Sequence, residues 1–396
     1  MLMNGSIADY EKLRQYFQLN IKGAGAVEIS VSKCQKMTFV PLTEATPCLL
    51  HPCSTGIYAG GGLAYLLKIL YNNMCDKSVL GGRATMIRED FTYDSRDNAT
   101  KIHAVVWKPD SVASPLAIVQ LVHGMSEHVN RYTEFAEFLT SNNIVVYAED
   151  HLGHGETCVG GKKGYFCKQD PATVVVRDVH RLKKIAEEQY PNVPYIILGS
   201  GMGSFILRNY LFRYGKGIDG AIIMATGVKS PLAVGTLKVL ASAGCMFRGG
   251  TKEAGLIAKI CLGSYSKRIN NARTMFDWLT HDAKIVDKYM NDSMCGFTFP
   301  ENGYKTLGEL LARLNRKSNI EKMPVTLKIL ITSGEEDPVG DYGQAPQKLY
   351  KQYIDEGMQH VSIKLYPDDR HELLNELNRD KVYKDLLDWI SDVAKC

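Results

Sequence analysis

The sequence LAIVQLV at residues 116–122 runs directly into HGMSEH at residues 123–128. The first stretch is apolar at nearly every position, which is typical of a strand buried on both faces of a parallel sheet. The second stretch is polar and begins with His-Gly, as expected where a buried strand ends and the chain turns. Ligands of open α/β sheets bind at the carboxyl ends of the strands. This stretch therefore predicts an α/β sheet with a functional site at that edge.

Strands and helices alternate on both sides of this stretch. Strands are expected at 91–94, 101–108, 144–148, 195–198, 220–224, 328–332 and 361–365, and helices at 133–139, 173–189, 204–214, 345–356 and 381–393. Such alternation predicts a doubly wound α/β sheet.

The alternation is interrupted between about residues 229 and 305, where only short helical patterns occur. A helical insertion inside an α/β sheet is typical of a cap over the site. The sequence pattern also changes near residue 85, after which strands and helices alternate regularly. We expect residues 1–85 to be an N-terminal extension of unknown role, with a helix over 9–19 and period-two stretches at 27–31 and 37–42. Residues 86–396 then form the main domain, with its cap at about 229–305.

The composition is that of an ordinary soluble globular protein, with 45% hydrophobic and 23% charged residues in 396. The net charge of +4 is spread along the chain and no nucleic-acid motif accompanies it, so we expect no nucleic-acid partner. No signal peptide is recognised. The apolar run at 57–71 is shorter than the roughly 20 residues of a membrane span. A core helix is favoured for it over an interface or a membrane-surface contact.

Ten cysteines are scattered through the chain, which indicates reduced thiols in a cytoplasmic protein. Cys48, His51 and Cys53 are close in sequence, but a fourth ligand with zinc-like spacing is missing. Packed thiols are the favoured interpretation, and we expect no metal.

Further polar motifs follow other expected strands. They are DHLGHG at 150–155, GSGMGS at 199–204, SGEEDP at 333–338 and PDDRH at 367–371. Singly, each has an ordinary structural explanation, because an Asp after a strand usually caps a turn or a helix. A glycine-rich turn can also bind phosphate, but this one lacks the Lys-Ser/Thr of a P-loop and the G-x-G-x-x-G spacing.

Together the motifs match the needs of ester hydrolysis, which uses a nucleophile, a base, a group that orients the base, and donors to the oxyanion. α/β-Hydrolases carry these in the order nucleophile, acid, histidine. Here the turn around Gly201, then Asp337, then His371 follow that order. His371 would be the general base and Asp337 its orienting acid. The backbone N–H groups of Met125 and Met202 would form the oxyanion hole.

At this point the chain resembles a known family. HGMSEHVNRY, DHLGHG, the turn at 199–204, SGEEDPVG and YPDDRHELLNE are similar to the bacterial monoacylglycerol lipase and lysophospholipase group of α/β-hydrolases, over residues from about 86 to 396. The resemblance implies a mostly parallel eight-stranded sheet, a helical cap and hydrolysis of lysophospholipids or monoacylglycerols without a cofactor. It assigns Asp337 and His371 to the triad, and Met125 and Met202 to the oxyanion hole.

One position departs from the family. Its turn reads G-x-S-x-G, and Gly201 stands where the serine is expected. Neither Ser200 nor Ser204 is a good replacement, because the turn exposes only its central residue. We therefore expect no turnover by the chain as written. Gly201 is either a laboratory substitution made to trap a substrate or a mark of a natural pseudoenzyme that binds an acyl ligand. The laboratory substitution is favoured, because the rest of the expected catalytic machinery is present. Acyl transfer or thioester cleavage on the same machinery is a further alternative.

Overall fold

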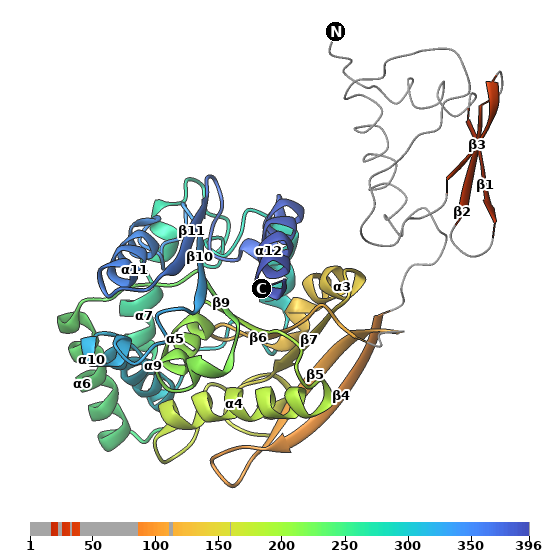
Figure 1. The fold of residues 1–396 in the computed structure, drawn as a ribbon. Coiled ribbons are helices and arrows are strands. Elements are labelled where there is room, and N and C mark those ends of the chain that lie inside the picture. The colour runs from red at the N-terminus through yellow and green to blue at the C-terminus, as the bar shows by residue number, and fades with distance from the viewer. Residues whose placement is uncertain are drawn as a thin grey trace. The chain divides into compact units, whose positions relative to one another are not determined.

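The computed structural model describes residues 86–110, 114–158 and 160–395, and the backbone of three strands before them. The chain divides into two compact units, Met1–Asp76 and Lys77–Cys396. In the first unit, β1 (Phe17–Lys22), β2 (Ala26–Val31) and β3 (Cys34–Phe39) form an antiparallel sheet, drawn in red in Figure 1. The helix expected over 9–19 is wrong at its end, because residues 17–19 pair with β2. Three predictions concern residues outside those that the structure describes. They are the earlier part of the expected helix, the run at 57–71 and the Cys48–Cys53 segment.

The second unit contains an eight-stranded sheet with the order β4-β5-β7-β6-β8-β9-β10-β11. Its strands are β4 (Met86–Asp94), β5 (Lys101–Pro109), β6 (Ala117–Val122), β7 (Ile144–Glu149), β8 (Tyr195–Ser200), β9 (Gly220–Met224), β10 (Lys328–Gly334) and β11 (His360–Tyr366). β5 is antiparallel to both of its neighbours, and all other pairs are parallel. This is the predicted α/β-hydrolase sheet, and the fold prediction is confirmed.

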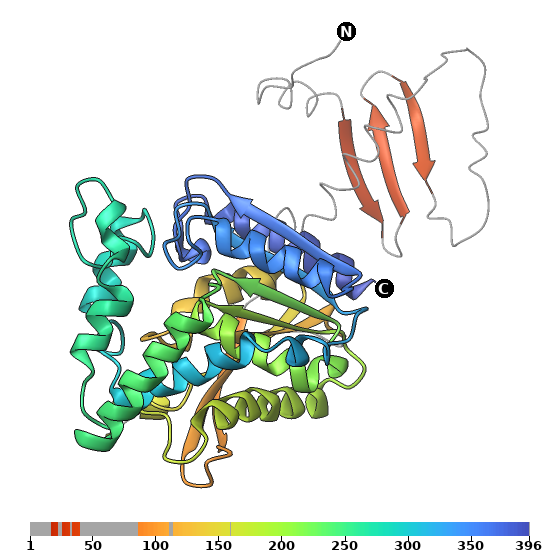
Figure 2. The ribbon, with the colours of Figure 1, turned by 90° about the vertical axis from the view of Figure 1, so that its left-hand side faces the viewer.

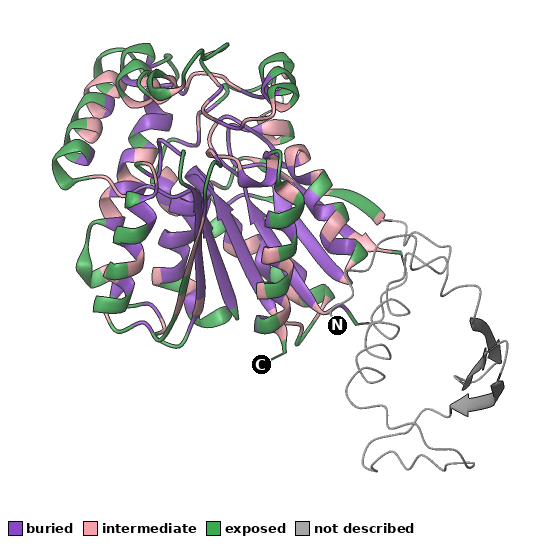
Figure 3. Cartoon of the chain, turned by 90° about the horizontal axis from the view of Figure 1, so that it is seen from above, coloured by how far each residue is buried: buried purple, intermediate pink, exposed green. Residues whose placement is uncertain are grey.

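Helices cover both faces of this sheet. α3 (Thr133–Ser141) and α12 (Arg379–Ala394) pack on one face, and α4 (Pro171–Gln189), α5 (Met202–Tyr214) and α11 (Gln344–Asp355) pack on the other. Figure 3 shows the buried strands between the two helical layers.

β6 shows why the stretch quoted first is apolar at nearly every position. Its side chains alternate between the two cores, with Ile118 on the α4–α5 side and Val119 on the α3–α12 side. The one polar residue, Gln120, is fully buried but satisfied, because it donates to the carbonyl of Val179 and accepts from the hydroxyl of Tyr195.

The insertion between β9 and β10 is helical. It contains α6 (Pro231–Phe247), α7 (Gly255–Leu262), α8 (Ala283–Asn291), α9 (Glu301–Leu314) and the short α10 (Lys317–Ile320). In Figure 2, α6 and α7 lie beyond the carboxyl ends of the strands, the edge at which the sequence predicts a site. α9 is not anticipated from the sequence; it packs against α5 and α6. Among the described residues, no helix combines the length and apolarity needed to cross a membrane.

Candidate active site

The turn between β8 and α5 places residue 201 at the edge of the sheet. Gly201 has φ 55° and ψ −118°, and its N–H donates to the carbonyl of Met224 at 3.1 Å. The flanking glycines are required by close packing. A Cβ atom on Gly199 would lie 2.4 Å from the carbonyl oxygen of Gly203, and one on Gly203 would lie 1.9 Å from that of Val122. The two small residues therefore let α5 begin directly against the sheet, with residue 201 between them.

Asp337 and His371, predicted from the ends of two other strands, form a pair. Nδ1 of His371 lies 3.0 Å from both carboxylate oxygens of Asp337. The carboxylate is fully buried, and Oδ1 also accepts the backbone N–H of Val339 at 2.8 Å. The ring of His371 packs at 5.0 Å from that of Trp278, which comes from the insertion. These contacts fix the orientation of the imidazole.

The environment of His371 favours its protonated form. Burial acts to lower the pKa of the imidazole, but the charge and hydrogen bond of Asp337 outweigh burial and raise the pKa above its ordinary value. Glu372 and Glu127 act in the same direction.

The structure brings Gly201 and His371 together. An ideal Cβ atom on Gly201 would lie 3.0 Å from Nε2 of His371, the ring nitrogen that Asp337 does not hold. The two neighbouring serines differ from each other. Ser204 is fully buried and its hydroxyl donates to the carbonyl of Gly201 at 2.6 Å, whereas Ser200 lines the same cavity as Gly201.

Met125 and Met202, expected at the oxyanion hole, line one cavity with Gly201 and His371. Met202 is the first residue of α5, so its backbone N–H has no acceptor within the helix. Met125 follows Gly124, whose Cα would lie 3.8 Å from a Cβ atom on Gly201. The turn after β6 and the start of α5 therefore flank the same point.

An ion-pair network beside the cavity was not predicted from the sequence. Arg131 donates to Glu127 at 2.7 Å and to the two carboxylate oxygens of Glu372 at 2.6 and 2.5 Å. Glu127 also accepts the backbone N–H of Gly124 at 2.6 Å. The four-residue spacing of Glu127 and Arg131 is a local signal for a pair, but Glu372 is distant in sequence. The network ties the turn after β6 to the loop that carries His371.

The motif DHLGHG makes structural contacts rather than lining the cavity. Asp150 accepts the backbone N–H groups of Val129 and Glu156 at 2.9 and 3.0 Å and faces Nδ1 of His103 at 2.8 Å. Burial raises the pKa of Asp150, but these hydrogen bonds outweigh it and lower the pKa to about 2. None of residues 150–155 is among those that line the cavity.

The cavity itself measures about 480 Å³ and is mostly apolar. The core contributes the residues described above, and the insertion contributes the apolar side chains of Leu262, Met275, Phe276, Trp278 and Leu279. An apolar cavity with a few convergent polar groups is typical of a small-molecule site.

The sequence and the fold of this chain are similar to those of known proteins. Residues 113–378 match the Hydrolase_4 family, described as "Serine aminopeptidase, S33". The chain is 27% identical over 288 residues to a monoacylglycerol lipase of Mycolicibacterium smegmatis, covering 72% of this chain and 91% of that protein. It is 28% identical over 284 residues to the monoglyceride lipase of Rattus norvegicus, covering 69% and 84%.

Among solved structures, the thermostable carboxyl esterase of Bacillus coagulans in complex with glycerol is 30% identical, with a TM-score of 0.72, and the match covers 78% of this chain and all of that one. The sequence and structure matches thus agree on one group of carboxylic ester hydrolases. The chain belongs to the Hydrolase_4 (serine aminopeptidase, S33) family of α/β-hydrolases.

Proposed function

We propose that this chain is built to bind and cleave a lipid-like acyl ester of the monoacylglycerol or lysophospholipid class, and that Gly201 occupies the nucleophile position. The observation that carries the proposal is the 3.0 Å separation between a Cβ atom on Gly201 and Nε2 of His371, whose other nitrogen faces Asp337. A serine hydroxyl at this position would reach the imidazole. With glycine there, the chain binds the ester but does not turn it over.

The chemistry with serine at position 201 follows from the arrangement. Nε2 of His371 takes the hydroxyl proton as the oxygen attacks the ester carbonyl, and Asp337 stabilises the imidazolium that forms. The N–H groups of Met125 and Met202 stabilise the oxyanion. His371 then gives the proton to the leaving alcohol, and water hydrolyses the acyl-enzyme by the same steps. Removal of the nucleophile from such a site costs on the order of 10⁶ in kcat.

An ester fits the cavity better than a peptide amino terminus. An amino group would need a carboxylate partner, and the acidic residues that line the cavity are Glu127 and Glu372. Both of these carboxylates are already paired with Arg131. The remaining lining is mostly apolar and suits an acyl chain.

A lipid surface is the proposed source of the substrate. The outer side of α6 exposes Leu232, Val239 and Met246, at 83%, 69% and 72% exposure. These residues are seven apart, so they lie along one face of the helix. Leu256 and Ile260 of the neighbouring α7 are also exposed, at 66% and 60%. Apolar patches of this kind are typical of protein or membrane contacts.

Activity-based labelling tests the proposed chemistry. The unmodified chain should not react with a fluorophosphonate probe and should not cleave p-nitrophenyl esters, whereas Gly201→Ser should do both. In the Gly201→Ser background, His371→Ala should abolish most turnover and Asp337→Asn should lower it by on the order of 10⁴-fold. Labelling of the unmodified chain at Ser200 or Ser204 would contradict the assignment of Gly201. A folded Gly201→Ser protein that binds acyl ligands without being labelled would instead indicate a binding protein.

A flotation assay with phosphatidylcholine vesicles tests the lipid contact. The combined Leu232→Ser, Val239→Ser and Met246→Ser protein should float with the vesicles less than the unmodified chain, because its apolar stripe is lost. Ile354→Ser, an exposed apolar residue on α11 at 43% exposure, is the control and should leave flotation unchanged. Equal flotation of all three proteins contradicts the contact.

A further inference from the structure

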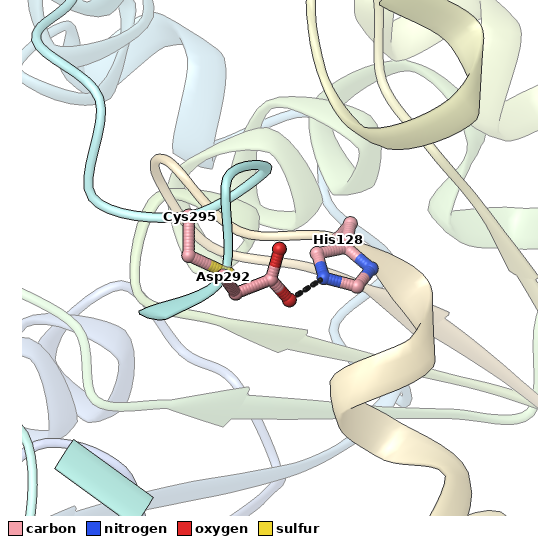
Figure 4. Close-up of side chains that lie close together, drawn as sticks. All are labelled: His128, Asp292 and Cys295. Carbon is pink, nitrogen blue, oxygen red and sulfur yellow. Dashed lines mark hydrogen bonds and ion pairs between the residues drawn. The ribbon is translucent and has the colours of Figure 1, made fainter. Parts of the chain in front are cut away.

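A cluster of three ligand-type side chains lies outside the proposed catalytic residues. His128 ends the turn after β6, and Asp292 and Cys295 follow α8 in the insertion. One ligand atom from each lies within 4.8 Å of the other two. Figure 4 shows these side chains converging from the two segments.

The two segments that supply the cluster are fixed against each other by the backbone. Gly296 donates its N–H to the carbonyl of Ser126 at 3.0 Å, and the hydroxyl of Ser126 donates to the carbonyl of Phe297 at 2.8 Å. The hydroxyl of Tyr289 donates to the same carbonyl of Ser126 at 3.1 Å. The cluster is therefore held between two ordered segments.

Asp292 is the centre of the contacts. Its Oδ2 lies 2.8 Å from Nε2 of His128, and its Oδ1 accepts the backbone N–H of Met294 at 2.8 Å. Partial burial raises the pKa of Asp292, but hydrogen bonds from His128, Met294 and the Cys295 thiol outweigh burial and lower the pKa. The carboxylate is thus ionised and faces both the imidazole and the thiol.

Charged groups of both signs lie around the cluster. Asp292, Glu127 and Glu372 are acidic, and Arg131 is the basic residue among the groups that act on Cys295. Arg131 is already shared by the two glutamates. Lys163 adds a second cation at this loop, where its ammonium donates to the carbonyl of Ser293.

We propose that His128, Asp292 and Cys295 form a Zn²⁺ site that joins the loop after α8 to the turn after β6. Imidazole nitrogen, thiolate sulfur and carboxylate oxygen are the ligand types of zinc, at about 2.0–2.3 Å from the metal. Tetrahedral ligands at that radius are about 3–4 Å from one another. Metal binding therefore needs only small movements, in which the 2.8 Å pair of His128 and Asp292 moves slightly apart. Water takes the fourth position. The site is separate from the proposed ester chemistry, which uses no metal.

Binding at this site requires loss of the thiol proton. Burial raises the pKa of the Cys295 thiol. Arg131 lowers this pKa, whereas the nearby acidic residues raise it further. Zn²⁺ must displace this proton when it binds the sulfur. Two further titratable groups pack here. Lys163 donates to the carbonyl of Ser293, and Tyr289 remains protonated because burial raises its pKa.

Metal content after exposure to Zn²⁺ alone tests the site in the full, reduced chain. After removal of loose metal, elemental analysis should find one more zinc per chain in the unmodified protein than in Cys295→Ser or Asp292→Asn. Cys167→Ser, which removes a similarly buried thiol elsewhere, is the matched control and should keep the full metal content. The same zinc content in all four proteins overturns the site.

Co²⁺ provides a second readout that does not depend on counting. The thiolate-to-Co²⁺ charge-transfer absorption of the unmodified chain should be weaker in Cys295→Ser and unchanged in Cys167→Ser, with folding of each variant checked by circular dichroism. If Cys295→Ser does not fold, the comparison rests on Asp292→Asn. Asp292 is partly exposed, so this change is expected to be tolerated by the fold. Equal absorption in the unmodified chain and the folded ligand variant contradicts the site.

Discussion

Gly201 has a backbone conformation that other residues adopt only with strain. Its φ of 55° lies in the region that favours glycine, and an added Cβ atom would lie 3.0 Å from Nε2 of His371. Strain of this kind costs roughly 1–3 kcal/mol, whereas the freer unfolded chain of glycine offsets about 0.4–1 kcal/mol. Gly201→Ser should therefore lower the free energy of unfolding by about 1 kcal/mol, a melting-point drop of roughly 2–4 °C.

Thermal melts without ligand measure this difference. Gly235→Ser is the control, because Gly235 lies in α6 with nothing within 4 Å of an added Cβ atom. Replacing a glycine in a helix interior should keep or raise stability. A Gly201→Ser protein that melts at or above the unmodified chain would show that position 201 is not strained.

The residues of the proposed site were predictable to different degrees. Asp337 and His371 follow two buried strands, and parallel strands bring such ends to one edge, so their pairing could be inferred from order alone. Arg131 and Glu372 also pair, but nothing in their local sequences indicates a partner 241 positions away. The same holds for His128 and Asp292, which are 164 positions apart. Contacts between loops depend on tertiary packing that local patterns do not record.

The two faces of α7 should have different effects on substrate choice. Leu262 lines the cavity, whereas Leu256 on the same helix is 66% exposed and does not line it. In the Gly201→Ser background, Leu262→Trp should shorten the preferred acyl chain, because the larger side chain fills part of the cavity. Leu256→Trp is the matched control and should leave the profile unchanged.

Rates with p-nitrophenyl esters of increasing chain length give the profile. The same profile for Leu262→Trp and its parent would place the acyl chain elsewhere in the cavity.

Most elements of the main sheet were predictable, because buried strands and amphipathic helices have clear periods. α9 was not, and its sequence shows why. Gly303 and Gly308 lie inside the helix, where glycine is unfavourable by roughly 0.5–1 kcal/mol relative to alanine. A Cβ atom on Gly303 would lie 2.6 Å from the carbonyl oxygen of Gly164, and one on Gly308 would lie 2.9 Å from Cγ of Lys238. Packing requires glycine at position 303, where the near atom is backbone, and packing rather than propensity maintains the helix.

A buried acidic group makes the stability of the main domain depend on pH. Burial raises the pKa of Glu149 to about 8, and the hydroxyl of Tyr93 donates to its carboxylate. The folded state therefore binds a proton that the unfolded state releases above about pH 4.3. Stability from this group is complete below that pH and is lost as the pH rises toward 8, at up to about 1.4 kcal/mol per pH unit.

Glu149→Gln should remove this loss, so its stability should fall less between pH 6 and pH 9 than that of the unmodified chain. Urea unfolding at several pH values measures the difference. Glu137→Gln, an exposed carboxylate on α3, should retain the pH dependence of the unmodified chain. Parallel curves for Glu149→Gln and the unmodified chain would mean that Glu149 is ionised when folded.

The conformation of the turn at residue 201 also affects which mutations are tolerated at this position. Some glycine and serine codons differ by a single base, so one point mutation suffices to interconvert the two residues. Because the φ of 55° suits glycine, a change from serine to glycine at this turn would remove the proposed nucleophile without harming the fold. Selection against misfolding would not act against such an allele. Only selection for the reaction itself would remove it. Under the proposed mechanism, a lineage would lose and regain hydrolysis by changes at this one position while the rest of the gene stayed intact.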